Sequence, residues 1–163
     1  MIPTNTNTST LSSLSFRQSI LTTEFDSYNR KDVIDFLKIS HVNYEKVIIP
    51  QIEQSFLGLM KLLPNEPSLG VIFNLFIKFQ ISLELHMKIE EQTLYPLALE
   101  QDAAVQSKIA DGASHEEPFL TEIIGCLNRQ SYARNPFCQT LINRLVNFNE
   151  ELKNHAWIEE HLI

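Results

Sequence analysis

Apolar residues recur at steps of three and four along four segments of the chain, and polar stretches containing proline, glycine or asparagine separate these segments. The first segment spans about residues 31–63 and the second about 68–100. The third and fourth each follow a turn signal, Asp111-Gly112 and Asn135-Pro136 respectively. Amphipathic helices with short connections predict an all-α protein, an antiparallel up-down four-helix bundle over residues 30–163.

Local signals predict where the helices begin and where they are disturbed. Ser114 followed by Glu117 has the pattern of a capping box, and Asn135-Pro136 places a cap before a proline in the first helical position. LPNEPSLG, residues 63–70, is expected to form the first turn. Pro50 is expected to kink the first helix, and Pro96 to bend the end of the second. Residues 1–29 are rich in Ser, Thr and Asn and are expected to be flexible.

Histidines and glutamates interrupt these apolar faces. Each predicted helix carries one histidine in its apolar stripe, and the second and fourth helices add a glutamate one turn later, on the same face. The pattern occurs in two similar stretches, HMKIEEQTLYP and HAWIEEHLI. The six residues are His41, His86, Glu90, His115, His155 and Glu159.

One histidine in an apolar stripe is usually an ordinary core residue, and one glutamate can extend to solvent. Two buried carboxylates without a cation would cost several kcal/mol each, so a metal site inside the bundle explains the six groups together. Four imidazoles and two carboxylates exceed the needs of one tetrahedral zinc and suit two ions. Nitrogen and oxygen donors without thiolate favour iron, and manganese or zinc can also bind. No histidine has the Glu-x-x-His spacing of ferritin-like bundles.

Composition narrows the function classes. The net charge is −7, from 20 acidic and 13 basic residues, and no basic patch indicates a nucleic-acid partner. The start of the chain lacks the basic and apolar regions of a secretory signal, and no apolar run is expected to span a membrane. Cys126 and Cys138 lack metal-site spacing and are expected to be buried thiols in a cytoplasmic protein.

The order of these motifs resembles that of the hemerythrin-like HHE cation-binding domains, including the di-iron domain of iron-centre repair proteins. The resemblance covers about residues 31–163 and rests mainly on HMKIEEQTLYP and HAWIEEHLI. It implies a non-haem di-iron centre with bridging carboxylates from Glu90 and Glu159. The implied terminal ligands are His41, His86, His115 and His155.

The chain departs from oxygen-carrying members of this family at two positions. Phe119 stands where they have a second histidine, and Glu159 where they have an aspartate. Repair proteins add a cysteine-containing N-terminal domain, and the first thirty residues here have no cysteine. The expected function is sensing of, or reaction with, O2, NO or an oxidant such as peroxide. The alternatives are iron donation to damaged clusters and a structural bundle with zinc or no metal, and the chain could act as a homodimer or with another protein.

Further residues near the motifs carry expectations of their own. Glu45 could be a ligand, an outer group or a solvated residue, and His161 is expected to be exposed. Glu91 and Glu160 lie about 100° around the helix from their neighbours and are expected to matter far less than Glu90 and Glu159. A dry pocket beside the metal is expected to be lined by Phe76, Phe79, Phe119 and Phe148.

Overall fold

The computed structural model describes residues 29–100 and 117–162, and within these ranges the chain is helical apart from short connections. The predicted all-α class is confirmed for this part of the chain. Two of the segments that were predicted as single helices contain a π-helical turn each, named η2 and η3. The elements are α2 (Arg30–Asn43), η2 (Tyr44–Ile48), α3 (Ile49–Leu62), α4 (Pro67–Ile89), η3 (Glu90–Leu94), α5 (Tyr95–Leu99), α7 (Glu117–Asn128) and α8 (Pro136–Leu162).

The helix starts follow the local signals where the structure describes them. The Asn29 side chain accepts a hydrogen bond from the backbone N–H of Asp32 and caps α2. Asn135 caps α8 in the same way, with its Oδ1 2.9 Å from the backbone nitrogen of Phe137. The first turn is shorter than expected, because α4 already begins at Pro67. The predicted cap at Ser114 lies outside the described residues, as do residues 1–28.

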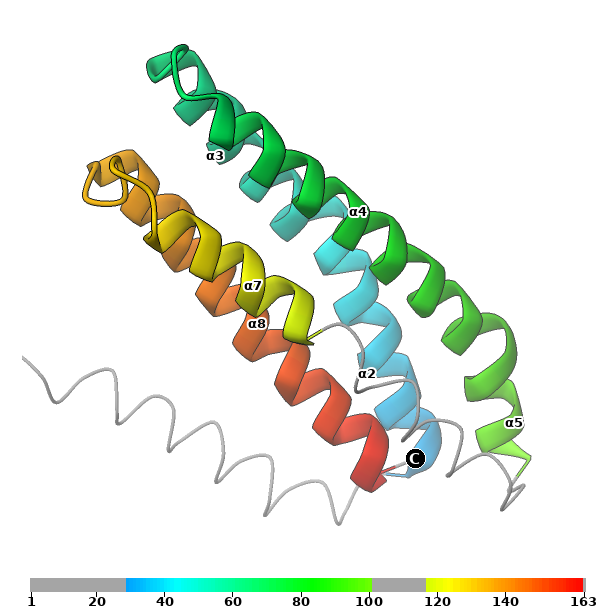
Figure 1. The fold of residues 1–163 in the computed structure, drawn as a ribbon. Helices are drawn as coiled ribbons and strands as arrows, with labels where there is room; N and C mark the ends of the chain where they lie inside the picture. Colours follow the sequence, from blue (N-terminus) through cyan, green and yellow to red (C-terminus); the bar gives the residue numbers. More distant parts are fainter. Residues whose placement is uncertain (1–28, 101–116, 163) are drawn as a thin grey trace, which may run out of the picture.

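The helices lie side by side as a bundle (Figure 1). α3 packs on α4 and on α8, and α7 packs on the same two helices, so the four enclose a common interior. That interior holds the large core, a cluster of twenty buried residues. Its largest fully buried side chains are Phe56, Phe76, Phe79 and Phe148.

The π-helical turns explain how the first two helices accommodate their prolines. Each turn ends two residues before a proline, at Ile48 ahead of Pro50 and at Leu94 ahead of Pro96. Proline has no N–H to give to the carbonyl four residues earlier, and a wider turn absorbs the missing bond. The buried face therefore passes from Tyr44 to Ile49, a step of five. A kink was predicted at Pro50 and a bend at Pro96, and the structure has a π-helical turn just before each of these prolines.

A small core lies beyond the large one, at the end of the bundle where α2 begins and where α5 and α8 end (Figure 1). Along α2, His41 separates Leu37 of the small core from Tyr44 of the large core. In the second helical segment, Glu90 lies between Met87 of the large core and Leu94 of the small core. In α8, His155 lies between Phe148 of the large core and Ile158 of the small core. A polar layer therefore divides the two apolar clusters. The small core consists of Val33, Ile34, Leu37, Leu94, Tyr95, Ala98 and Ile158.

One helical stretch of 33 residues, Pro67–Leu99, is long and apolar enough by length and composition to cross a membrane. Length and composition alone do not decide whether this stretch spans a membrane, so the expectation that no apolar run does so stays a prediction. The stretch combines core-facing residues with outward-facing ones such as Ile81, Leu85 and Ile89, which are about half exposed or more. A core helix of this composition meets the same criterion, so the stretch alone is weak evidence for a membrane location.

Candidate metal centre

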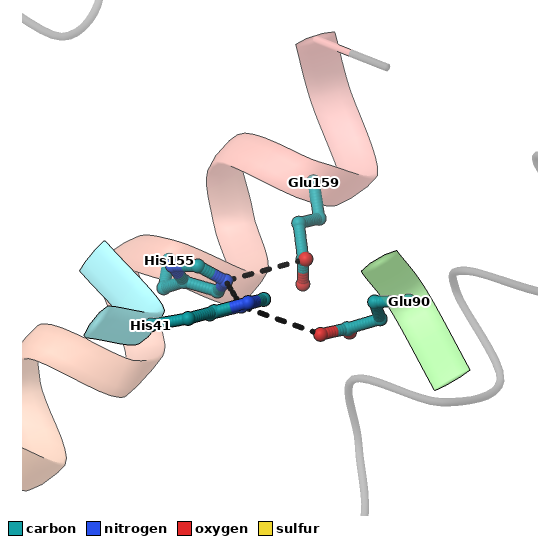
Figure 2. A group of neighbouring side chains, drawn as sticks. All are labelled: His41, Glu90, His155 and Glu159. Carbon is teal, nitrogen blue, oxygen red and sulfur yellow. Dashed lines mark hydrogen bonds and ion pairs between the residues drawn. The ribbon is translucent and has the colours of Figure 1, made fainter. Parts of the chain in front are cut away.

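Four of the predicted ligands meet in the polar layer. The donor atoms of His41, Glu90, His155 and Glu159 all lie within 4.8 Å of one another, and all four residues are buried. α2 contributes His41, η3 contributes Glu90, and α8 contributes both His155 and Glu159. Figure 2 shows the two imidazoles and the two carboxylates pointing toward one another from these three elements.

The separations of the donor atoms suit ligands of a shared cation. The Nε2 atoms of His41 and His155 are 2.9 Å apart. Glu159 Oε1 lies 3.3 Å from His155 Nε2, and Glu90 Oε2 lies 3.5 Å from His41 Nε2. Two donors at right angles on a metal with bonds of about 2.0–2.2 Å are about 3 Å apart. The group can therefore close around a metal ion without large rearrangement.

Glu90 stands between two histidines. Its Oε1 lies 2.6 Å from His86 Nε2, whereas its Oε2 faces His41. His86 itself differs from the prediction, because its side chain is 25% exposed and the neighbouring Met87 occupies the buried stripe. The structure therefore places His86 at the edge of the buried group, in contact with one oxygen of Glu90.

Two buried polar atoms of the group lack a hydrogen-bond partner. They are Glu90 Oε2 and His155 Nδ1. An unpaired buried acceptor costs about 1–3 kcal/mol, and more when it is charged. A cation between Glu90 and His41 would satisfy the carboxylate oxygen, so this donor set fits a metal ion.

Burial and mutual charge set the protonation of the group. Burial, with the nearby charge of His155, lowers the pKa of His41 to about 4. Burial raises the pKa of Glu90 to about 7, although the hydrogen bond with His86 opposes the change. Burial also acts to raise the pKa of Glu159, but hydrogen bonds and charge from His155, together with Tyr95, outweigh it and lower that pKa. A neutral His41 and an ionised Glu159 are the forms that bind metals.

Two further side chains contact the group and were not predicted as part of it. Glu91 Oε1 lies 2.8 Å from His41 Nδ1. The Tyr95 hydroxyl donates a 2.5 Å hydrogen bond to Glu159 Oε1 and lies 3.4 Å from His41 Nε2. Glu91 was expected to matter far less than Glu90 because of its angle on the helix, and that angle did not indicate its contact with His41. The signal for Tyr95 was its place within the first motif copy, HMKIEEQTLYP, five residues after Glu90.

A cavity of about 40 Å³ adjoins the group. His41, His86, His155 and Glu159 form part of its lining. The predicted phenylalanine lining is wrong, because none of the four residues lines this cavity: Phe76, Phe79 and Phe148 lie in the large core, and Phe119 is 46% exposed. The volume suffices for one or two molecules of water size. The remaining lining residues are Tyr44, Leu83, Met87, Leu152, Lys153 and Ala156.

The other candidate residues that the structure describes lie away from the group. Glu45 is half-buried and does not belong to the group of converging donors. His161 is exposed, as predicted, and its ring stacks on Trp157. His115 lies outside the described residues. Both cysteines are free, and only Cys138 is fully buried, so the expectation of two buried thiols holds for one of them.

Comparisons with known proteins assign no family to the chain. No protein-family model matches it, no curated protein matches it, and no solved structure matches it.

Proposed function

We propose that this protein is a hemerythrin-like non-haem di-iron protein that senses or reacts with a small molecule such as O2, NO or peroxide. The observation that carries the proposal is the position of Glu90, whose two oxygens face two different histidines. A carboxylate in this position suits a bridge between two metal ions. His41, His155 and Glu159 would complete one ion's protein ligands, and His86 would bind the other.

The predicted sixth ligand, His115, stays a prediction. The second ion would need donors besides His86 and the Glu90 oxygen that faces it, and His115 is the residue that the sequence pattern offers. Histidine and carboxylate donors without thiolate favour iron over softer metals. When bound, such ions supply redox chemistry and open coordination positions, while the protein supplies orientation and a largely apolar surrounding.

The cavity supports the choice of a small ligand. Its volume of about 40 Å³ suits diatomic molecules or peroxide. Leu83, Met87 and Leu152 give part of its wall an apolar surface, and His41 and His155 bring the donor group to the same space. A molecule in the cavity would therefore meet the metal without a large displacement of side chains.

The short connections support an antiparallel up-down arrangement of the proposed bundle. Only residues 63–66 join α3 to α4, and only residues 129–135 join α7 to α8. Helices of this length joined by a few residues pack as antiparallel neighbours. We propose this topology together with the hemerythrin-like assignment.

Metal analysis of the purified protein tests the proposal. We expect about two iron ions per chain after anaerobic loading with ferrous iron, measured by elemental analysis, and a visible spectrum after exposure to air. Glu159→Ala should sharply lower the occupancy, whereas Glu160→Ala, at an exposed position in the same motif, should leave it unchanged. At most one ion per chain would contradict the two-metal centre, and equal losses in both variants would contradict the ligand assignment.

A further inference from the structure

We infer that Glu91 and Tyr95 are positioning residues that hold His41 and Glu159 in the orientation needed for metal binding. The inference rests on the proposed metal-binding function and deepens it. It goes beyond the ligand set, because neither residue belongs to the four converging donors. Both residues belong to the first motif copy: Glu91 lies in η3, and Tyr95 is the first residue of α5.

Glu91 determines which nitrogen of His41 carries the proton. A carboxylate oxygen accepts hydrogen bonds, so His41 donates from Nδ1 to Glu91 Oε1 across the 2.8 Å contact. A neutral imidazole then keeps its lone pair on Nε2. That atom is the one that faces His155 and Glu90. Glu91 therefore selects the tautomer of His41 that can bind a cation in the buried group.

Tyr95 orients Glu159 from inside the protein. Its side chain is fully buried, and its hydroxyl donates to Glu159 Oε1 at 2.5 Å. The same ring stacks on the imidazole of His41, with centroids 5.9 Å apart and planes inclined by 18°. Tyr95 thus contacts one ligand from α2 and one from α8. A Tyr95→Phe variant would keep the stacking of the ring on His41 and remove only the hydrogen bond from the hydroxyl to Glu159.

The π-helical turn makes this double contact available. In an α-helix, residue 95 would point well away from Glu90, because each residue turns the helix by about 100°. In η3 the backbone bonds run from residue i to i+5, so the position five residues on returns close to the same face. Glu90 and Tyr95 are accordingly both buried at the polar layer. Glu91 remains at the edge, with its side chain 39% exposed, and reaches His41 from there.

The second motif copy has no equivalent of these contacts among the described residues. Glu160 matches Glu91 in the motif, but its side chain is 57% exposed, and the ion pair found for it is a 4.0 Å contact with His161. Glu160 therefore provides a matched control for Glu91. One segment of the chain, from His86 to Tyr95, contributes two proposed ligands, His86 and Glu90, and both positioning groups.

Cobalt(II) binding separates a positioning role from a general structural role. The affinity of the full chain for Co²⁺ would be measured by competition with a chelator, and the ligand geometry by the visible ligand-field spectrum of the bound ion. We expect Tyr95→Phe and Glu91→Ala to weaken binding by about 10-fold to 100-fold, the range found for such outer contacts, and to change the spectrum. Glu91→Gln should recover much of the affinity, because its amide oxygen still accepts from Nδ1. Glu160→Ala should match the unaltered protein in both measurements.

The outcomes distinguish this inference from the proposed function. An unaltered protein that binds no Co²⁺ would contradict the proposed function and, with it, this inference. If the unaltered protein binds Co²⁺ and the Tyr95 and Glu91 variants bind it equally well with the same spectrum, only the positioning role is wrong. An intense visible tyrosinate band in the ferric iron-loaded protein, lost in Tyr95→Phe, would show that Tyr95 binds the metal directly and would overturn its assignment as a positioning residue.

Discussion

Replacing Glu90 with glutamine is expected to stabilise the metal-free protein at pH 8, although it removes a proposed ligand. The wild-type carboxylate is buried, and burial raises its pKa from the ordinary value of 4.5 to about 7. At pH 8 the folded protein must therefore hold an ionised carboxylate in a site that disfavours charge. Glutamine has a similar shape and no charge, so the metal-free variant avoids this cost.

The sign and size of the effect follow from the pKa of Glu90. Between pH 4.5 and 7 the folded state binds more protons than the unfolded state, so wild-type stability falls as the pH rises through this window. A difference of about 2.5 pH units corresponds to about 3 kcal/mol. For a chain of this length, that free energy corresponds to roughly 6–12 °C in the midpoint of thermal unfolding. The advantage of Glu90→Gln should grow from near zero at pH 4.5 to this value at pH 8.

Thermal and urea unfolding of chelator-treated protein at several pH values between 4.5 and 8 would measure the effect. His41 has the opposite linkage, because its lowered pKa reduces stability as pH falls from 6.5 toward 4. To a first approximation both proteins share that contribution, so it cancels in the comparison. Glu160→Gln, at an exposed position, should show no pH-dependent difference. A Glu90→Gln variant that is no more stable than wild type at pH 8, or whose advantage does not grow with pH, would refute the reasoning.

Three further predictions concern the cavity, the large core and the thiols. Ala156→Leu should occupy the cavity, leave the metal content unchanged and slow azide binding to the iron-loaded protein several-fold in stopped-flow absorbance; unchanged rates would show that ligands enter elsewhere. Phe56→Ala removes a fully buried ring and should cost about 3–5 kcal/mol in urea unfolding; a loss below about 1 kcal/mol would contradict its core role. Cys126 should react with Ellman's reagent in the folded protein, whereas burial raises the pKa of Cys138 and should delay its reaction until unfolding; two fast thiols would contradict the described burial.

Periodicity predicted the all-helical class and most of the buried group of histidines and glutamates. His155 and Glu159 lie four residues apart in an uninterrupted helix, and there the assumption of about 100° per residue holds. His41 precedes η2, and Glu90 is the first residue of η3. The wide turns therefore do not displace either residue from the predicted face. An unpaired buried carboxylate is energetically costly. Glu90 and Glu159 in apolar stripes therefore indicated a functional group, and the structure does bring them together.

The same reasoning failed beyond the π-helical turns and across helices. Tyr95 belongs by residue type to any apolar core, and its hydroxyl contact depends on a wide turn that periodicity does not reveal. Glu91 was judged by its angle to Glu90 on the same helix, whereas its partner, His41, is on a neighbouring helix. Phe119 was aligned with the wrong face of α7, because Leu120 and Ile123 define the buried one. Contacts between helices depend on how each helix is rotated about its axis relative to its neighbour. The periodicity of one helix does not give this rotation.

Because the interior is divided into two apolar clusters, metal binding should change the local stability of one end of the bundle. The seven residues of the small core lie beyond a layer of buried histidines and carboxylates, so that end of the bundle has little apolar contact with the rest. In metal-free protein its backbone amides should exchange with solvent through local opening, at a free energy below that of global unfolding. A cation bound by His41, Glu90, His155 and Glu159 would join the three helical segments there and raise that local free energy. Trp157, the only tryptophan, packs against the small core, so its fluorescence would record the change from a loosely held to a firmly ordered end.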